Sequence, residues 1–179
     1  MNNEELLSKK EIQTDIMRYK NNSASFWLCI LAIVLDAVMF IMIYKNKDCV
    51  PGVTAGLDLI VNVIFLLAVF LIAEKTKAYS KKAAYGAIVV GVVQIARIFW
   101  IPLYFRNQNK IYLEELAKAE QAGEQLSYTG MVGLEKGQFN AAVILMAVSA
   151  AVLFVAAVIT IVKNKRLQAH LEKIEGRGK

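Results

Sequence analysis

The chain alternates between long apolar stretches and short polar segments rich in lysine. Four stretches are nearly free of charge and cover residues 26–44, 53–73, 83–104 and 140–162. Each has about the 17–25 residues that a helix needs to cross the hydrocarbon of a bilayer. Apolar residues surround the whole predicted helix, whereas a buried helix of a soluble protein shows a one-sided stripe. The pattern predicts an all-α, polytopic membrane protein with four transmembrane helices in a bundle.

The composition supports this class. Of 179 residues 57% are hydrophobic, and the mean hydropathy is +0.45. A soluble domain has about 45–50% apolar residues. Residues 1–25 are polar and lack the apolar core of a cleavable signal, so we expect the first span to act as an uncleaved signal anchor. Neither end carries a lipidation motif.

Lysine and arginine predict the topology, because cytoplasmic loops of membrane proteins are enriched in them. Fourteen of the 21 lie in residues 1–25, in the loop between spans two and three, or in the tail 163–179. The other two loops carry only six: Lys45, Lys47, Arg106, Lys110, Lys118 and Lys136. We therefore expect a multi-pass protein of the plasma membrane with both termini in the cytoplasm.

The segments between and around the spans are short. Ser8 and Glu11 have capping-box spacing, and a short apolar stripe of Ile12, Ile16 and Tyr19 follows. Residues 1–25 are therefore expected to form a cytoplasmic amphipathic helix, which lies along the inner membrane surface or the base of the bundle, or else against a partner. The outer loop 105–139 is expected to be helical at 110–122 and irregular where glycines cluster. Pro102 is expected in the last turn of the third span, marking its end.

The net charge of +6 indicates membrane rather than nucleic-acid contact. The basic residues sit just inside the spans, and no basic face interleaved with aromatics is visible. Lys163, Lys165 and Arg166 are expected to contact anionic lipid head groups, each contributing about 1 kcal/mol.

A charged and polar layer interrupts the apolar spans. Counted at about 1.5 Å per residue, Arg97 lies roughly 11 Å below the outer end of its span and Asp58 about 8 Å below the end of another. Asp36 lies near mid-bilayer. Three further polar residues fall in the same slab: Asn62, Gln94 and Asn140.

An unpaired charge at this depth costs at least about 2.5–3.5 kcal/mol. A guanidinium can bind a carboxylate through two parallel hydrogen bonds. Asp58 matches Arg97 best in depth, and Asp36 is the second candidate. The layer admits three interpretations: an internal ion pair that fixes helix register, a pair across an interface with another membrane subunit, or a substrate or proton site with Asp36 as the carrier.

The remaining positions indicate helix packing. The fourth span is rich in alanine and serine, and Gly86 and Gly91 lie in the third span; small residues let helices approach closely. Four aromatics near span ends are expected to form an interfacial belt: Trp27, Tyr44, Trp100 and Tyr104.

No motif for catalysis, a cofactor or a metal is visible, since His170 is the only histidine and Cys29 and Cys49 are too far apart along one helix to pair. We therefore predict a non-catalytic accessory, regulatory or assembly subunit of a larger membrane complex, such as a transporter. Its partners would be other membrane subunits, or itself as a homo-oligomer. The alternative is a small oligomeric transporter or channel using Asp36, Asp58 and Arg97, and a third possibility is a membrane-stress or membrane-perturbing protein.

Overall fold

The computed structural model of the chain describes residues 9–12, 23–44, 53–77, 80–125 and 133–176. Nearly all of them belong to four long helices: α2 (Ser23–Tyr44), α3 (Val53–Lys77), α4 (Lys81–Ala122) and α5 (Lys136–Gly176). No strand occurs in these ranges. All four helices are long and apolar enough to cross a membrane. The all-α class and the four candidate spans are therefore confirmed.

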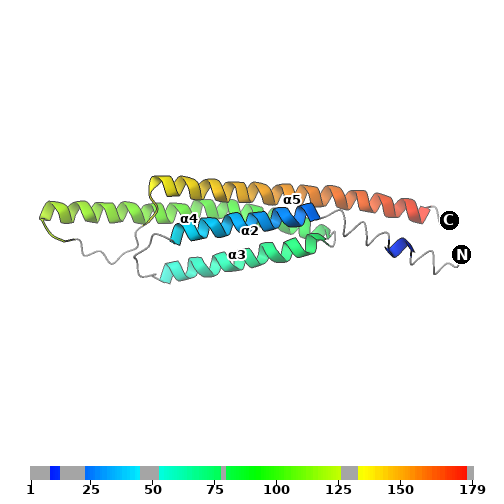
Figure 1. Ribbon diagram of the computed structural model, residues 1–179, viewed down its shortest axis with the longest axis horizontal. Coiled ribbons are helices and arrows are strands. Elements are labelled where there is room, and N and C mark those ends of the chain that lie inside the picture. Colours follow the sequence, from blue (N-terminus) through cyan, green and yellow to red (C-terminus); the bar gives the residue numbers. More distant parts are fainter. Residues whose placement is uncertain (1–8, 13–22, 45–52, 78–79, 126–132, 177–179) are drawn as a thin grey trace.

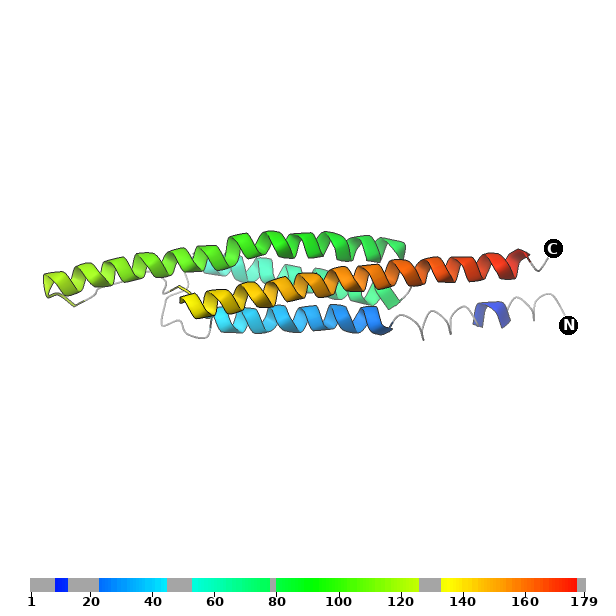
Figure 2. The same cartoon turned by 90° about the horizontal axis from the view of Figure 1, so that it is seen from above.

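The helices lie side by side and alternate in direction (Figures 1 and 2). α2 packs mainly against α3 and α5, and α4 also packs mainly against α3 and α5. We call the end at which α2 begins and α5 ends the near end, and the opposite end the far end. α2 and α4 run from near to far, and α3 and α5 run back.

Buried positions follow a narrow stripe on each helix. On α2 they recur every three or four residues: Ser25, Cys29, Ala32, Asp36, Met39 and Ile43. This alternation of four-residue and three-residue steps is typical of helices that interlock while packed at a small angle. Large apolar side chains such as Leu31 and Val34 lie outside the stripe and are exposed. The helices thus bury one side against each other and present apolar surface all around.

Two apolar clusters make up the interior. The near cluster combines α2, α3 and α5, and its buried members are Cys29, Ala32, Phe65, Val69, Ala73, Leu153 and Ala156. The far cluster combines α2, α4, α5 and the chain just before α5, and its buried members are Met39, Ile43, Ile101, Phe105, Leu134, Ala142 and Met146. Among the described side chains of α3, no buried one belongs to the far cluster. Asp36 and Arg97 lie between the two along the helices.

The third and fourth apolar stretches belong to helices longer than a single crossing. α4 has 42 residues and α5 has 41. Residues 110–122 are helical as predicted, but they continue α4 without a break. α4 ends at Gly123, whose φ of 67° is the left-handed conformation that glycine adopts most readily.

The expectation that Pro102 ends its helix was wrong. Pro102 is buried inside α4, twenty residues before the helix ends. Proline cannot supply the N–H that the Ile98 carbonyl would accept in a regular helix. Ile101 and Phe105, on either side of Pro102, are both buried in the far cluster. Their packing keeps the chain helical where the local sequence favours an end.

The beginning of α5 is fixed against α4 by a backbone contact. The Leu134 amide donates a hydrogen bond of 3.1 Å to the Phe105 carbonyl. A Cβ atom on Gly133 would overlap that carbonyl oxygen and the Asn109 amide nitrogen, so only glycine permits this approach. α5 therefore starts level with Phe105, and the rest of α4 projects beyond the other helices at the far end (Figure 1).

Some predicted features fall outside the described residues. They include Ser8 and most of the N-terminal amphipathic segment, of which residues 9–12 are helical. Cys49 also lies there. Cys29 is a buried free thiol on α2.

Candidate functional site

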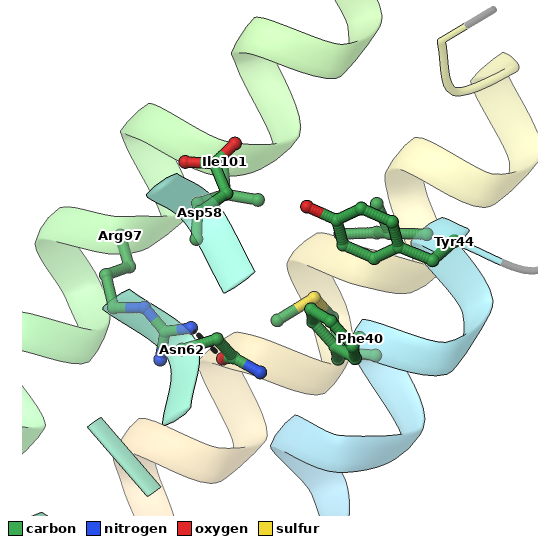
Figure 3. Close-up of a pocket in the computed structure, with 8 residues that line it drawn as sticks. Phe40, Tyr44, Asp58, Asn62, Arg97 and Ile101 are labelled. Carbon is green, nitrogen blue, oxygen red and sulfur yellow. Dashed lines mark hydrogen bonds between the residues drawn. The ribbon is translucent and has the colours of Figure 1, made fainter. Parts of the chain in front are cut away.

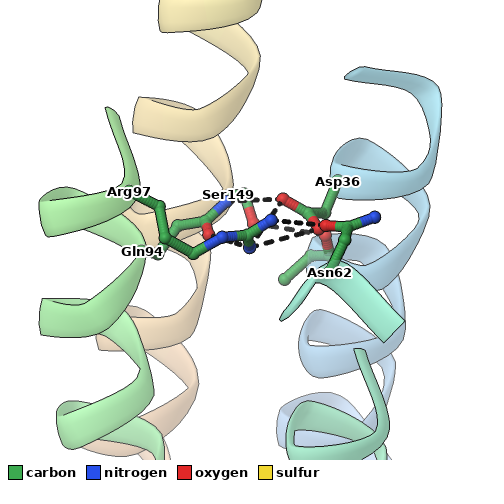
Figure 4. A network of polar contacts seen from close by, with 6 residues as sticks. Asp36, Asn62, Gln94, Arg97 and Ser149 are labelled. Carbon is green, nitrogen blue, oxygen red and sulfur yellow. Dashed lines mark hydrogen bonds and ion pairs between the residues drawn. The ribbon is translucent and has the colours of Figure 1, made fainter. Parts of the chain in front are cut away.

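Arg97 lies at the centre of the polar layer and is almost completely buried, with 4% of its surface exposed. Its Nη1 atom donates to both carboxylate oxygens of Asp36, at 3.2 and 3.3 Å. Asp36 is fully buried on α2. One guanidinium nitrogen thus reaches both oxygens, in place of the two parallel bonds expected from the fork geometry (Figure 4).

Gln94 completes the contact between these two charges. Its Nε2 donates to Asp36 Oδ1 at 2.8 Å, and its Oε1 accepts from Arg97 Nη1 at 2.7 Å. Gln94 stands one helical turn before Arg97, so both groups face α2 from the same side of α4. The three side chains form a closed triangle in which the carboxylate accepts bonds from a cation and from a neutral amide.

α3 contributes the neutral part of the layer. Arg97 Nη2 donates to Asn62 Oδ1. The guanidinium carbon also lies 4.1 Å from the centre of the Phe65 ring, one turn further along α3, where cation–π attraction favours the charge. Arg97 therefore contacts α2 through an ion pair and α3 through an amide and an aromatic face.

α5 closes the layer through Ser149, whose role the sequence analysis missed. The Ser149 hydroxyl is buried and donates to the Ala32 carbonyl of α2 at 3.2 Å (Figure 4). Serine in an alanine-rich span was interpreted only as a small packing residue. A hydroxyl at the depth of Asp36 and Arg97 was the available signal.

The expected pairing of Arg97 with Asp58 was wrong, and Asp36 is the partner in the structure. Helical side chains lean toward the N-terminus of their own helix. Arg97 and Asp36 lie on helices that run from near to far, so both lean toward the near end. Asp58 lies on α3, which runs the other way, and leans toward the far end. The sequence-based prediction compared only the depths of the Cα atoms and did not take these opposite directions into account.

Asp58 is half-buried and lines a small cavity of about 10 Å³ beside the layer (Figure 3). Tyr44, Asn62 and Arg97 line the same cavity, together with the apolar side chains Met39, Phe40, Ile43 and Ile101. A cavity of this size has room for about one water. Buried Arg97 Nε has no hydrogen-bond partner among the described residues.

Of the six residues predicted for the polar layer, Asn140 is the one that the structure places outside it. It is exposed in the first turns of α5, beyond the polar layer toward the far end. The structure thus brings together Asp36, Asn62, Gln94 and Arg97, with Asp58 at the edge.

The predicted close packing is present around this layer. A Cβ on Gly91 would lie 3.1 Å from the Phe154 ring, and one on Gly86 would lie 3.3 Å from Ile72. Five small residues of α5 are buried: Ala142, Ser149, Ala150, Ala156 and Ala157. Among the four belt aromatics, Trp27 and Trp100 are exposed, whereas Tyr44 and Tyr104 stack edge-on against Phe105.

The layer is built to neutralise charge. Asp36 and Arg97 compensate each other, and two amide side chains supply the remaining polar contacts. Within the described part of the chain, no group of three His, Cys, Asp or Glu side chains could hold a metal ion. The chain matches no protein-family model, no curated protein and no solved structure, so the site is interpreted from its own geometry.

Proposed function

We propose that the chain is a four-span integral protein of the plasma membrane that acts, without catalysis of its own, as an accessory, regulatory or assembly subunit of a larger membrane complex such as a transporter. The four helices would form a transmembrane bundle with the near end in the cytoplasm. Two observations support this placement: the apolar exposed surface of the helices and the excess of lysine and arginine toward the near end.

The proposal that the chain does not itself transport a solute rests on one observation: the polar side chains of the layer bond to each other within a single chain. Arg97 is bonded to Asp36, Gln94 and Asn62, and the adjoining cavity has room for about one water. A solute pathway through a single chain would need a wider polar space at this depth. The layer is better suited to fixing the register of four helices, the first of the three interpretations.

Surfaces for partners are then expected outside the layer. The part of α4 beyond Asn109 projects from the far end and exposes Ile111 and Leu113. Exposed apolar side chains on a projecting helix fit a contact with another subunit or a second copy. At the near end, Lys163, Lys165 and Arg166 follow the apolar part of α5 and would meet anionic lipid head groups.

The test combines crosslinking with reconstitution. A photo-crosslinking amino acid at Ile111 should capture one membrane protein, identified by mass spectrometry, and at Phe70, an exposed α3 position near the other end, it should not. Crosslinks to the same chain alone would indicate a homo-oligomer. Ion or solute flux by the purified protein in vesicles would contradict the accessory role.

A small oligomeric transporter or channel is the second candidate, and the position of Asp58 favours it. A carboxylate, a tyrosine and the layer's arginine meet at one cavity. If several copies enlarge that space, flux in vesicles containing this protein alone should fall strongly in Asp58→Asn. Unchanged flux in that variant would remove Asp58 from the pathway.

A further inference from the structure

A second cavity, of about 410 Å³, lies at the far end between α4 and the start of α5, away from the polar layer. Its volume is within the range of about 300–1,000 Å³ that is usual for small-ligand sites. The residues lining it are Arg106, Asn109, Lys110, Tyr112, Leu113, Leu134, Glu135 and Lys136.

The lining carries an excess of positive charge. Arg106, Lys110 and Lys136 are cationic, and Glu135 is the only carboxylate among the lining residues. None of the three cations forms an ion pair with a described carboxylate. The Arg106 guanidinium carbon lies over the Phe139 ring, 4.8 Å from the ring centre. The cavity therefore attracts an anion.

The backbone contact at Gly133 builds this arrangement. Arg106 and Lys110 are four residues apart and share one face of α4. The close approach of Gly133 and the Leu134 amide to α4 carries Lys136 to the same place. Lys136 opens α5, so the positive end of the helix dipole adds to the field. The three cations come from segments thirty residues apart, held by a fixed contact.

The chemistry of the cavity fits a phosphate group. Arginine and lysine bind phosphate oxygens through charged hydrogen bonds, and the Asn109 amide adds a neutral donor. Leu113 and Leu134 supply an apolar wall next to these polar groups. Arg106 directly follows Phe105 of the far cluster, so the cavity sits where the apolar part of the molecule ends.

We propose that this cavity binds a phosphate group, presented either by the head group of an anionic phospholipid or as free phosphate. The proposal does not depend on the accessory role, and it concerns the end of the molecule opposite to Lys163, Lys165 and Arg166. Glu135 opposes the negative charge of the ligand and limits the affinity.

The experiment uses the purified full-length chain in a nonionic detergent. Thermal unfolding is followed during titration with inorganic phosphate, short-chain phosphatidylglycerol, or phosphatidylcholine of the same chain length. In the double variant Lys110→Gln with Lys136→Gln, affinity for the bound anion should fall at least about tenfold, because two charged hydrogen bonds to the phosphate oxygens are lost. Glu135→Gln should raise the affinity.

Lys118→Gln is the matched control. Lys118 is an exposed lysine of the same helix, outside the cavity and bonded to Glu115. Stabilisation by phosphatidylglycerol alone assigns the site to a lipid, and stabilisation by inorganic phosphate assigns it to the free ion. Equal binding of phosphatidylcholine, no binding of either anion, or an equal loss in Lys118→Gln would overturn the proposal. If the double variant folds poorly, the higher anion affinity expected for Glu135→Gln still tests the proposal.

Discussion

The near and far clusters both include α2 and α5, but the third helix is α3 in the near cluster and α4 in the far cluster. The near cluster includes α3 through Phe65, Val69 and Ala73, and much of its remainder is small. The far cluster uses larger side chains and holds α2, α4 and α5 without a buried residue of α3. At that end α3 presents Asp58 to the small cavity instead. α3 is thus anchored at the near end and at the polar layer. Toward its far end, the described residues 56–61 are exposed, apart from the half-buried Asp58.

The polar layer separates the clusters, and breaking it should have the largest effect. Arg97→Leu leaves Asp36 buried without its cation and should lower the free energy of unfolding by about 3–5 kcal/mol. Adding Asp36→Leu should recover most of the loss, whereas adding Asp58→Leu should not. Denaturant titration in detergent measures all three. Equal recovery in the two double variants would contradict the assigned pair.

Truncations in the two clusters should affect α3 differently. Leu153 and Met146 are both fully buried on α5, one in each cluster. Changing either residue to alanine should lower the free energy of unfolding by roughly 2 kcal/mol. This is the low end of the range for such changes, because the hydrophobic effect contributes less to helix association in lipid than in water.

Amide hydrogen exchange distinguishes the two variants. Leu153→Ala should increase exchange along α3, and Met146→Ala should leave α3 close to the unmodified protein. The same α3 exchange in both would show that the clusters are not independent.

The backbone contact at the far end offers a smaller change with a close control. Gly133→Ala forces a methyl group into the Phe105 carbonyl and should cost about 1–3 kcal/mol, as overpacking does. Gly137→Ala meets no atom within 4 Å and should be neutral or slightly stabilising. Thermal unfolding of both variants measures the difference. Equal stability would mean that α5 does not need to approach α4 so closely.

The smallest effect is expected on the projecting part of α4. Lys118 and Glu115 form an ion pair of 2.7 Å with both side chains largely exposed. Exposed pairs of this kind contribute little to stability because solvent screens them. Thermal unfolding of Lys118→Gln should therefore stay close to that of the unmodified protein, and closer still at high salt. A larger loss would indicate that the projection packs against something in the purified protein.

The helices could be predicted from the sequence because apolar runs of this length have few alternatives. The membership of most of the polar layer could also be predicted, since charged groups in apolar spans must meet. The partner of Arg97 could not, because it depends on the direction in which each side chain leans. The continuity of α4 through Pro102 depends on packing around Ile101 and Phe105, which no local pattern contains. The role of Gly133 depends on its contact with Phe105 and Asn109, which lie on α4, far back along the chain.

Asp36 and Arg97 lie 61 residues apart, so the acid leaves the ribosome well before the base. At about 5–20 residues per second, the interval is roughly 3–12 s. For that time α2 and α3 exist without the cation that compensates Asp36. α4 is synthesised last of the three helices, and its Arg97 then supplies the positive charge that compensates Asp36.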